Sequence, residues 1–255
     1  MKKFIVFIFI LSALSCELKA QQPRTIRGFT SISDQNKNKL EKRTFSFQPK
    51  GNIKDLVLNI QNISANLIIK GEDRSDIELE AEGLLGLPEK AKGLRAVSKY
   101  GEDNTEMGLN LEQIGNEVKL TGTNVKRSRQ AVFTLIVPQD MGLSIEYLSW
   151  NSENLIVKTM KGGIEAQVST ANILLDQVTG PLSISSRGGN VEVIYSEVSK
   201  EAVTVLSSTS GDIDITIAES ANVDFDINQT SGEIFTDLDI AFTYDKQEKE
   251  DVKLN

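Results

Sequence analysis

The chain has 255 residues, of which 28 are Lys or Arg and 36 are Asp or Glu, so its formal net charge is −8. An acidic surface excludes nucleic-acid binding, because that binding depends mainly on the neutralisation of phosphates by Lys and Arg. The lack of histidine excludes Ser-His-Asp and Cys-His catalysis and histidine-ligated zinc, and the single cysteine excludes an internal disulfide.

Residues 1–20 have the three parts of a secretory signal peptide. Lys2 and Lys3 form a positive start, residues 4–14 form an apolar segment, and a more polar stretch ends at Ala20. Eleven apolar residues are too few for a transmembrane helix, which needs about 20. The sequence therefore predicts export, without a transmembrane helix, to the periplasm, the outer membrane, the cell surface or the medium.

Cys16 has two alternative fates. The segment "SALSC" resembles a bacterial lipobox, although Ala13 occupies the position where that pattern usually carries Leu. Retention of Cys16 would make it a lipidation site and the protein a lipoprotein with a lipid anchor, whereas cleavage after Ala20 would remove it. Without residues 1–20 the chain carries 25 basic and 35 acidic residues, a net charge of −10.

We expect residues 21–54 to form a partly disordered amino-terminal extension and residues 55–240 to form one β domain. Apolar residues alternate with polar ones through residues 55–73, which predicts two strands around a polar turn at Ser64, Ala65 and Asn66. Further strands are predicted at 76–83, 116–122 and 131–140, and residues 88–97 predict a short helix that begins at a proline.

A repeat follows in the second half of the chain. Short copies of one pattern, a polar turn with glycine followed by an alternating strand, have their glycines at Gly163, Gly189, Gly211 and Gly232, spaced by 26, 22 and 21 residues. Residues 168–176 form a weaker copy, in which Asn172 is interpreted as standing at the glycine position. We interpret the glycines as positive-φ turn residues.

Second strands of the same style lie between these copies, at 180–186, 201–208 and 221–229. Side chains alternate along a strand, so Ile213, Ile215 and Ile217 are expected in the core while Asp212, Asp214 and Thr216 face water. Units of about 20 residues cannot bury an apolar face alone and must stack. The expected fold is all-β: a stacked-strand β-solenoid, similar to a single-stranded β-helix, with a diverged amino-terminal half; the alternative is a β-sandwich.

The order of these motifs resembles the bacterial putative-adhesin domain family of exported β-solenoid domains. The resemblance rests on the signal peptide, the alternating strand pair, the strand ending in "LIVP" and the "S-x-x-G-[DNE]-[IV]" turns, and it covers residues 56–240. It implies a role at the envelope or surface, and it implies no catalytic site, cofactor or metal. Residues 241–255 depart from the family pattern as a charged carboxy-terminal tail that caps the last repeat or is disordered.

Three carboxylate pairs are the remaining candidates for chemistry: Asp212 with Asp214, Asp224 with Asp226, and Asp237 with Asp239. An i, i+2 spacing places both members on one face of a strand, as a calcium site or a glycosidase acid/base pair would require. The alternative is that they keep the outward faces soluble and discourage edge pairing, which is our interpretation.

For three other groups of residues, the sequence allows either a binding role or a structural role. Lys126, Arg127 and Arg129 are either an anion-binding cluster or a solvated turn, and we favour the turn. Trp150 and Tyr147 are either a sugar-stacking platform or packing residues, and we favour packing. Asn62 and Asn228 match a eukaryotic glycosylation pattern, which the bacterial resemblance makes accidental.

The sequence thus predicts a non-catalytic exported cell-envelope protein, with no cofactor. Its stacked strands would present a Ser/Thr/Asp-rich face to an envelope or extracellular partner, a protein or a glycan. The alternatives are a purely structural envelope subunit and a carbohydrate-active β-helical enzyme in which outward carboxylates meet an arginine such as Arg187.

Overall fold

The structure is a computed structural model that describes residues 40–87, 89–91, 93–148, 154–200, 203–238, 242–244 and 251–254. These residues belong to one compact unit, Ser33–Asn255. The predicted signal peptide and Cys16 lie outside the described residues. No helix in the described ranges is long and apolar enough to cross a bilayer.

Two large sheets form most of this unit. Sheet A has eight strands, in the spatial order β1 (Leu40–Phe47), β4 (Ile77–Leu85), β9 (Val132–Pro138), β3 (Asn66–Glu72), β11 (Leu155–Lys158), β13 (Ile173–Val178), β15 (Val191–Tyr195) and β17 (Ile213–Thr216). Sheet B has seven, in the order β16 (Val205–Ser208), β14 (Leu182–Ser186), β12 (Ile164–Val168), β10 (Gly142–Tyr147), β2 (Val57–Gln61), β8 (Glu117–Gly122) and β7 (Leu109–Ile114).

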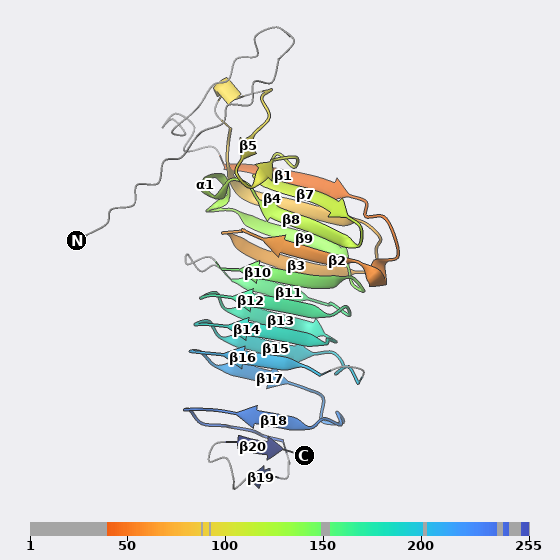
Figure 1. The fold of residues 1–255 in the computed structure, drawn as a ribbon, viewed down its shortest axis with the longest axis vertical. Coiled ribbons are helices and arrows are strands. Elements are labelled where there is room, and N and C mark those ends of the chain that lie inside the picture. Colours follow the sequence, from red (N-terminus) through yellow and green to blue (C-terminus); the bar gives the residue numbers. More distant parts are fainter. Residues whose placement is uncertain are drawn as a thin grey trace, which may run out of the picture. The chain divides into compact units, whose positions relative to one another are not determined.

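Consecutive strands of the chain form a rung, with one strand in sheet B and the next in sheet A. The rungs are β8–β9, β2–β3, β10–β11, β12–β13, β14–β15 and β16–β17, and neighbouring rungs pair in parallel in both sheets. Figure 1 shows β10, β12, β14 and β16 following one another along sheet B. The predicted stacked β-solenoid is confirmed.

The amino-terminal half belongs to the same solenoid, out of chain order. The rung β2–β3 lies between β8–β9 and β10–β11, because β2 pairs with both β8 and β10 while β3 pairs with both β9 and β11. Inward side chains from Leu56 to Val193 form a single buried apolar cluster. The repeats and the amino-terminal half therefore share one core.

Antiparallel strands cover the amino-terminal end of the solenoid. β7 pairs with β8 in sheet B, and β4 pairs with β9 and with β1 in sheet A. Strand β1 lies within residues 21–54, which the sequence predicted to be an amino-terminal extension. Its residues Phe45 and Phe47 pack against the core. The helix predicted at 88–97 is reduced to the 3-10 turn η3 (Glu89–Ala91), which is followed by the short pair β5 (Val97–Ser98) and β6 (Gly101–Glu102).

The parallel register corrects the sequence alignment of the repeat. Ile173, Val191 and Ile213 are in register, so Asn172 stands beside Asn190 and Asp212, and Ala171 takes the position of Gly189. The prediction that Asn172 replaces glycine is therefore wrong. Gly163 precedes β12 in sheet B and belongs to a different set of turns.

Gly189 is also required for a reason other than the predicted one. Its φ is not positive, but a Cβ built on it would lie 1.8 Å from the carbonyl oxygen of Ala171 in the neighbouring rung. The missing side chain allows two backbones to approach closely. Gly211 (φ +154) combines a positive φ with a similar approach, 2.6 Å, to the oxygen of Gly189.

The carboxy-terminal part departs from the predicted repeat. Strand β18 (Phe225–Asn228) pairs antiparallel with β20 (Asp251–Leu254), which pairs with β19 (Phe242–Tyr244). Residues 229–237, a predicted copy of the repeat, contain no strand, whereas the tail contributes β19 and β20. Ile213 and Ile215 are 39% and 38% exposed and not core residues as predicted, because β17 is the last strand of sheet A.

Candidate functional site

The outer surface of sheet B is the candidate site, and we call it the polar face. Its side chains alternate with buried ones such as Ile145, Ala166 and Ile184, so that one side of each strand faces the core and the other faces water. The outward residues of the parallel strands are mostly hydroxyl, amide and charged groups: Asn59, Gln61, Lys119, Thr121, Ser144, Glu146, Glu165, Gln167, Ser183, Ser185 and Ser207.

The polar face is ordered in rows that run across the strands. One row takes one residue from each rung, in the order Thr121, Gln61, Glu146, Gln167, Ser185 and Ser207. Parallel strands are about 4.8 Å apart, so hydrogen-bonding groups recur along the row at that interval. Such a row offers donors and acceptors to an extended polymer laid across the strands, and it does not gather groups around one point.

The outer surface of sheet A has a different chemistry. Ile68, Ile156 and Leu174 are adjacent in one row and half-buried. In the next row the Lys158 ammonium lies 3.2 Å from the Asp176 carboxylate. The two outer surfaces therefore differ. The serines and threonines of the expected Ser/Thr/Asp-rich face lie on sheet B, but no aspartate is among the outward residues of its described strands.

On the sheet A side, Arg74 forms hydrogen-bonded ion pairs with two carboxylates. Nη2 of Arg74 lies 2.8 Å from Asp76 Oδ2 and 3.2 Å from Glu78 Oε2. The hydrogen bond from Arg74 lowers the pKa of Asp76, and the hydrogen bond to Asp76 raises the pKa of Arg74. The group is an ion-pair network and has no free donor set for a metal.

The predicted carboxylate pairs are solvent-exposed. Asp212 and Asp214 lie before and on β17, Asp224 and Asp226 lie before and on β18, and Asp237 is exposed beyond it, while Asp239 is outside the described residues. Nowhere in the described ranges do three or more acidic, Cys or His side chains gather as metal ligands. Arg187 is exposed, and no ion pair between described residues joins it to these aspartates.

The predicted basic cluster is divided by the fold. It forms helix α1 (Val125–Ser128), whose first turn is capped by the side chain of Asn124. Lys126 and Arg129 are exposed, but only 2% of the Arg127 side chain is exposed. The solvated-turn interpretation is therefore wrong for Arg127.

The buried Arg127 guanidinium links the strands and loops that cover the amino-terminal end of the solenoid. It donates to the carbonyl oxygens of Leu85 (2.9 Å) and Glu106 (2.6 Å) and lies 3.5 Å from Asp103 Oδ2 and 3.7 Å from Glu41 Oε2. Burial lowers the pKa of Arg127, and the two carboxylates oppose that shift. Sequence reasoning missed Asp103 and Glu41, because both are far from residue 127 in the chain and match no motif.

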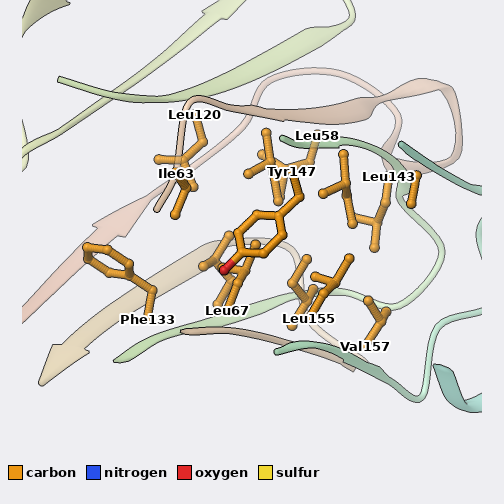
Figure 2. Packing of buried hydrophobic residues seen from close by; sticks show 14 of the residues in the cluster. Leu58, Ile63, Leu67, Leu120, Phe133, Leu143, Tyr147, Leu155 and Val157 are labelled. Atoms are coloured by element: carbon orange, nitrogen blue, oxygen red, sulfur yellow. The ribbon is translucent and has the colours of Figure 1, made fainter. Parts of the chain in front are cut away.

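Tyr147 is a core residue and not half of a sugar-binding platform. Its side chain is 1% exposed, and its hydroxyl donates to the carbonyl oxygen of Ala65. Figure 2 shows its ring inside the apolar cluster with Leu67 and Leu155. The packing interpretation is confirmed for Tyr147, while Trp150 lies outside the described residues.

The two asparagines of the glycosylation pattern occupy unlike positions. Asn62 has φ +56 in the turn after β2, and its amide donates to the carbonyl oxygen of Gly122, which is a structural contact. Asn228 is exposed on β18.

The architecture defines the protein as a β-solenoid with two strands in each rung. A family model described as Toastrack DUF4097 matches residues 121–254, more than half of the chain. The chain therefore belongs to the Toastrack DUF4097 family, which confirms the resemblance to the putative-adhesin domains. The comparison with curated proteins finds no match.

Three solved bacterial structures are similar at low sequence identity. A putative cell adhesion protein from Clostridium sporogenes ATCC 15579 is 11% identical, with a TM-score of 0.33 over 70% of this chain and 99% of its own. A putative adhesin from Bacteroides fragilis NCTC 9343 is 13% identical, with a TM-score of 0.26 over 71% and 98%. A putative adhesin from Parabacteroides merdae ATCC 43184 is 11% identical, with a TM-score of 0.31 over 70% and 78%.

Proposed function

We propose that this protein is a non-catalytic, exported cell-envelope protein that binds an extended extracellular or envelope polymer, a glycan or a protein chain, through the polar face. The observation that carries the proposal is the row Thr121, Gln61, Glu146, Gln167, Ser185 and Ser207, with one polar side chain from each rung. A repeating polymer can form the same hydrogen bond at each rung, so many weak contacts add up across a flat surface.

Residues on two neighbouring rungs provide the test. Gln167 and Ser185 are exposed and adjacent in the row, so Gln167→Arg/Ser185→Arg adds bulk and charge to the face without entering the core. The control is Thr134→Arg/Glu192→Arg, which places two arginines on the outer surface of sheet A and changes the net charge by +3, against +2 in the test variant.

The assay is retention of the labelled protein on envelope fractions of its own bacterium and on an array of extracellular glycans. We expect the sheet B variant to lose at least about 1.4 kcal/mol of binding free energy, a tenfold change in Kd, and the control to keep its affinity. Equal loss in both variants, or none in either, would place the binding surface elsewhere.

We also propose export through the signal peptide, with Cys16 as the candidate lipid anchor. A retained and diacylated Cys16 would hold the domain at a membrane by acyl chains. Intact mass and membrane fractionation of the native protein, beside a Cys16→Ala variant, test this. A mature chain that begins at Gln21 would remove the anchor from the proposal and leave a free exported domain.

A further inference from the structure

The carboxy-terminal end of the six described rungs is apolar and unpaired. Val191 and Val193 of β15 are 1% and 0% exposed, yet their register partners Ile213 and Ile215 on β17 are 39% and 38% exposed. Strands β16 and β17 are the last of their sheets, so each has one edge of backbone groups with no strand beside it. The opposite end of the solenoid is covered by β1, β4 and β7, and this end has no equivalent cover among the paired strands.

The next segment of the chain repeats the pattern of the last rung. A shift of 21 residues superimposes Gly211 on Gly232, and it also superimposes Leu206 on Ile227 and Ile213 on Ile234. Phe225 and Ile227 alternate with exposed residues along β18 and are partly buried. The period-two pattern is that of a strand with one face on a core.

The connection is long enough for a further rung. Nine residues separate β15 from β16, and eight residues separate β17 from β18. β18 is an edge strand of its three-stranded sheet, since only β20 pairs with it. Its second edge is therefore available to β16.

A ladder of side-chain acceptors also stops at this end. The backbone N–H of Asn190 donates to Asn172 Oδ1 (3.1 Å), and that of Asp212 donates to Asn190 Oδ1 (3.1 Å). Each side chain thus receives the N–H of the following rung. Asp212 follows Asn190 in this ladder, and its carboxylate can accept a further N–H. With the 21-residue shift, the donor to Asp212 would be the backbone N–H of Glu233.

Gly232 supports the same register. In the rungs that are paired, Gly189 and Gly211 let backbones approach, because a Cβ on them would lie 1.8 Å and 2.6 Å from a carbonyl oxygen of the preceding rung. A Cβ on Gly232 meets nothing closer than the side chain of Gln229 at 4.0 Å. Its position in the repeat matches a close approach to the backbone of Gly211.

We propose that residues 221–237 of the same chain dock on this end as a seventh rung, with β18 parallel to β16 and residues 233–236 parallel to β17. The docked segment covers Leu206, Ile213 and Ile215 with Phe225, Ile227 and Ile234. Since β18 keeps β20 on its other edge, docking extends sheet B without breaking the antiparallel pairs.

Disulfide trapping in the full chain tests the register, in a Cys16→Ala background. Asp214 and Phe235 are both exposed, and the proposed rung places them side by side on the outer face, so Asp214→Cys/Phe235→Cys should close under mild oxidation. Glu192→Cys/Asp214→Cys is the positive control, because this pair is already in register. Asp214→Cys/Ile234→Cys is the slip control, because a shift of one residue turns the second thiol to the other face.

We expect an intramolecular disulfide in the monomer, formed at about the rate of the positive control and about tenfold faster than in the slip control. Non-reducing electrophoresis and peptide mapping distinguish the outcomes. A disulfide-linked dimer would show that a second copy supplies the segment and would overturn intramolecular docking. No disulfide, with the positive control closed, would overturn the seventh rung altogether.

Discussion

Replacing Gly189 by alanine tests the close packing of the rungs most directly. The added Cβ would lie 1.8 Å from the Ala171 carbonyl oxygen, whereas ordinary contact begins near 3.4 Å, so the two backbones would have to separate by 1.6 Å, the difference of these values. A shift of that size would break the bonds that join the rungs here, from Ile173 N to Asn190 O (2.8 Å) and from Asn190 N to Asn172 Oδ1 (3.1 Å).

Each lost bond contributes about 0.5–1.5 kcal/mol, and a buried group left unpaired costs about 1–3 kcal/mol. We therefore expect Gly189→Ala to lower the free energy of unfolding by about 3 kcal/mol, at the upper end of ordinary overpacking. Urea unfolding followed by far-UV circular dichroism measures this difference, with the slope m compared between variants.

Gly188 provides the matched control. A Cβ there would lie 3.7 Å from the Ser169 oxygen, and its φ is not in the left-handed region. Gly188→Ala should change stability by no more than about 0.5 kcal/mol, or raise it slightly by restricting the unfolded chain. A Gly189→Ala variant as stable as the wild type would refute the close approach. If Gly188→Ala and Gly189→Ala lowered the free energy of unfolding equally, the cause would be a general intolerance of alanine in this turn and not the contact with Ala171.

Other contacts give three further predictions. Arg127→Met should cost about 3–5 kcal/mol in urea unfolding, because it leaves Asp103 buried without its cation; a loss below about 1 kcal/mol would contradict the ion pair. The hydrogen bond from Arg74 lowers the pKa of Asp76. The stability that this ion pair contributes is therefore fully present above the pKa of Asp76 in the unfolded chain, about 4, and is lost as the pH falls through its pKa in the folded protein. Arg74→Gln should remove this dependence, and parallel unfolding midpoints from pH 7 to pH 3 in both proteins would count against it. Tyr147→Phe should cost about 1–3 kcal/mol because it leaves a buried carbonyl unpaired, and an unchanged midpoint would exclude that hydrogen bond.

The period-two alternation is local information, so the sequence predicted the strands and their two faces well. Residues 164–168, 182–185 and 191–193 alternate apolar and polar side chains, and each lies in a strand whose apolar side is buried. The same reasoning predicted the polar outer surface, because the outward residues follow directly once the inward ones are known.

The neighbours of each strand were decided by the tertiary structure. Any two strands of period two can pair in parallel, so sequence order suggested a simple succession of rungs, whereas β2–β3 lies between β8–β9 and β10–β11. The misassigned position of Asn172 has the same origin, since register depends on which backbones meet. The row of the polar face therefore needed the fold.

Burial of polar groups was likewise beyond the sequence. Arg127 stands among charged residues in a stretch that is typical of a solvated turn. Tyr147 shares a strand face with Leu143 and Ile145, so the alternation indicates that it is inward, but it does not indicate the partner of its hydroxyl. Both are buried by residues distant in the chain, including Glu41 and Ala65. Thus the sequence by itself determined most of the strands, their apolar faces and the class of fold, because these depend on local periodicity. Only the tertiary structure decided register, neighbours, polar burial and where the paired strands end, because these depend on contacts between remote segments.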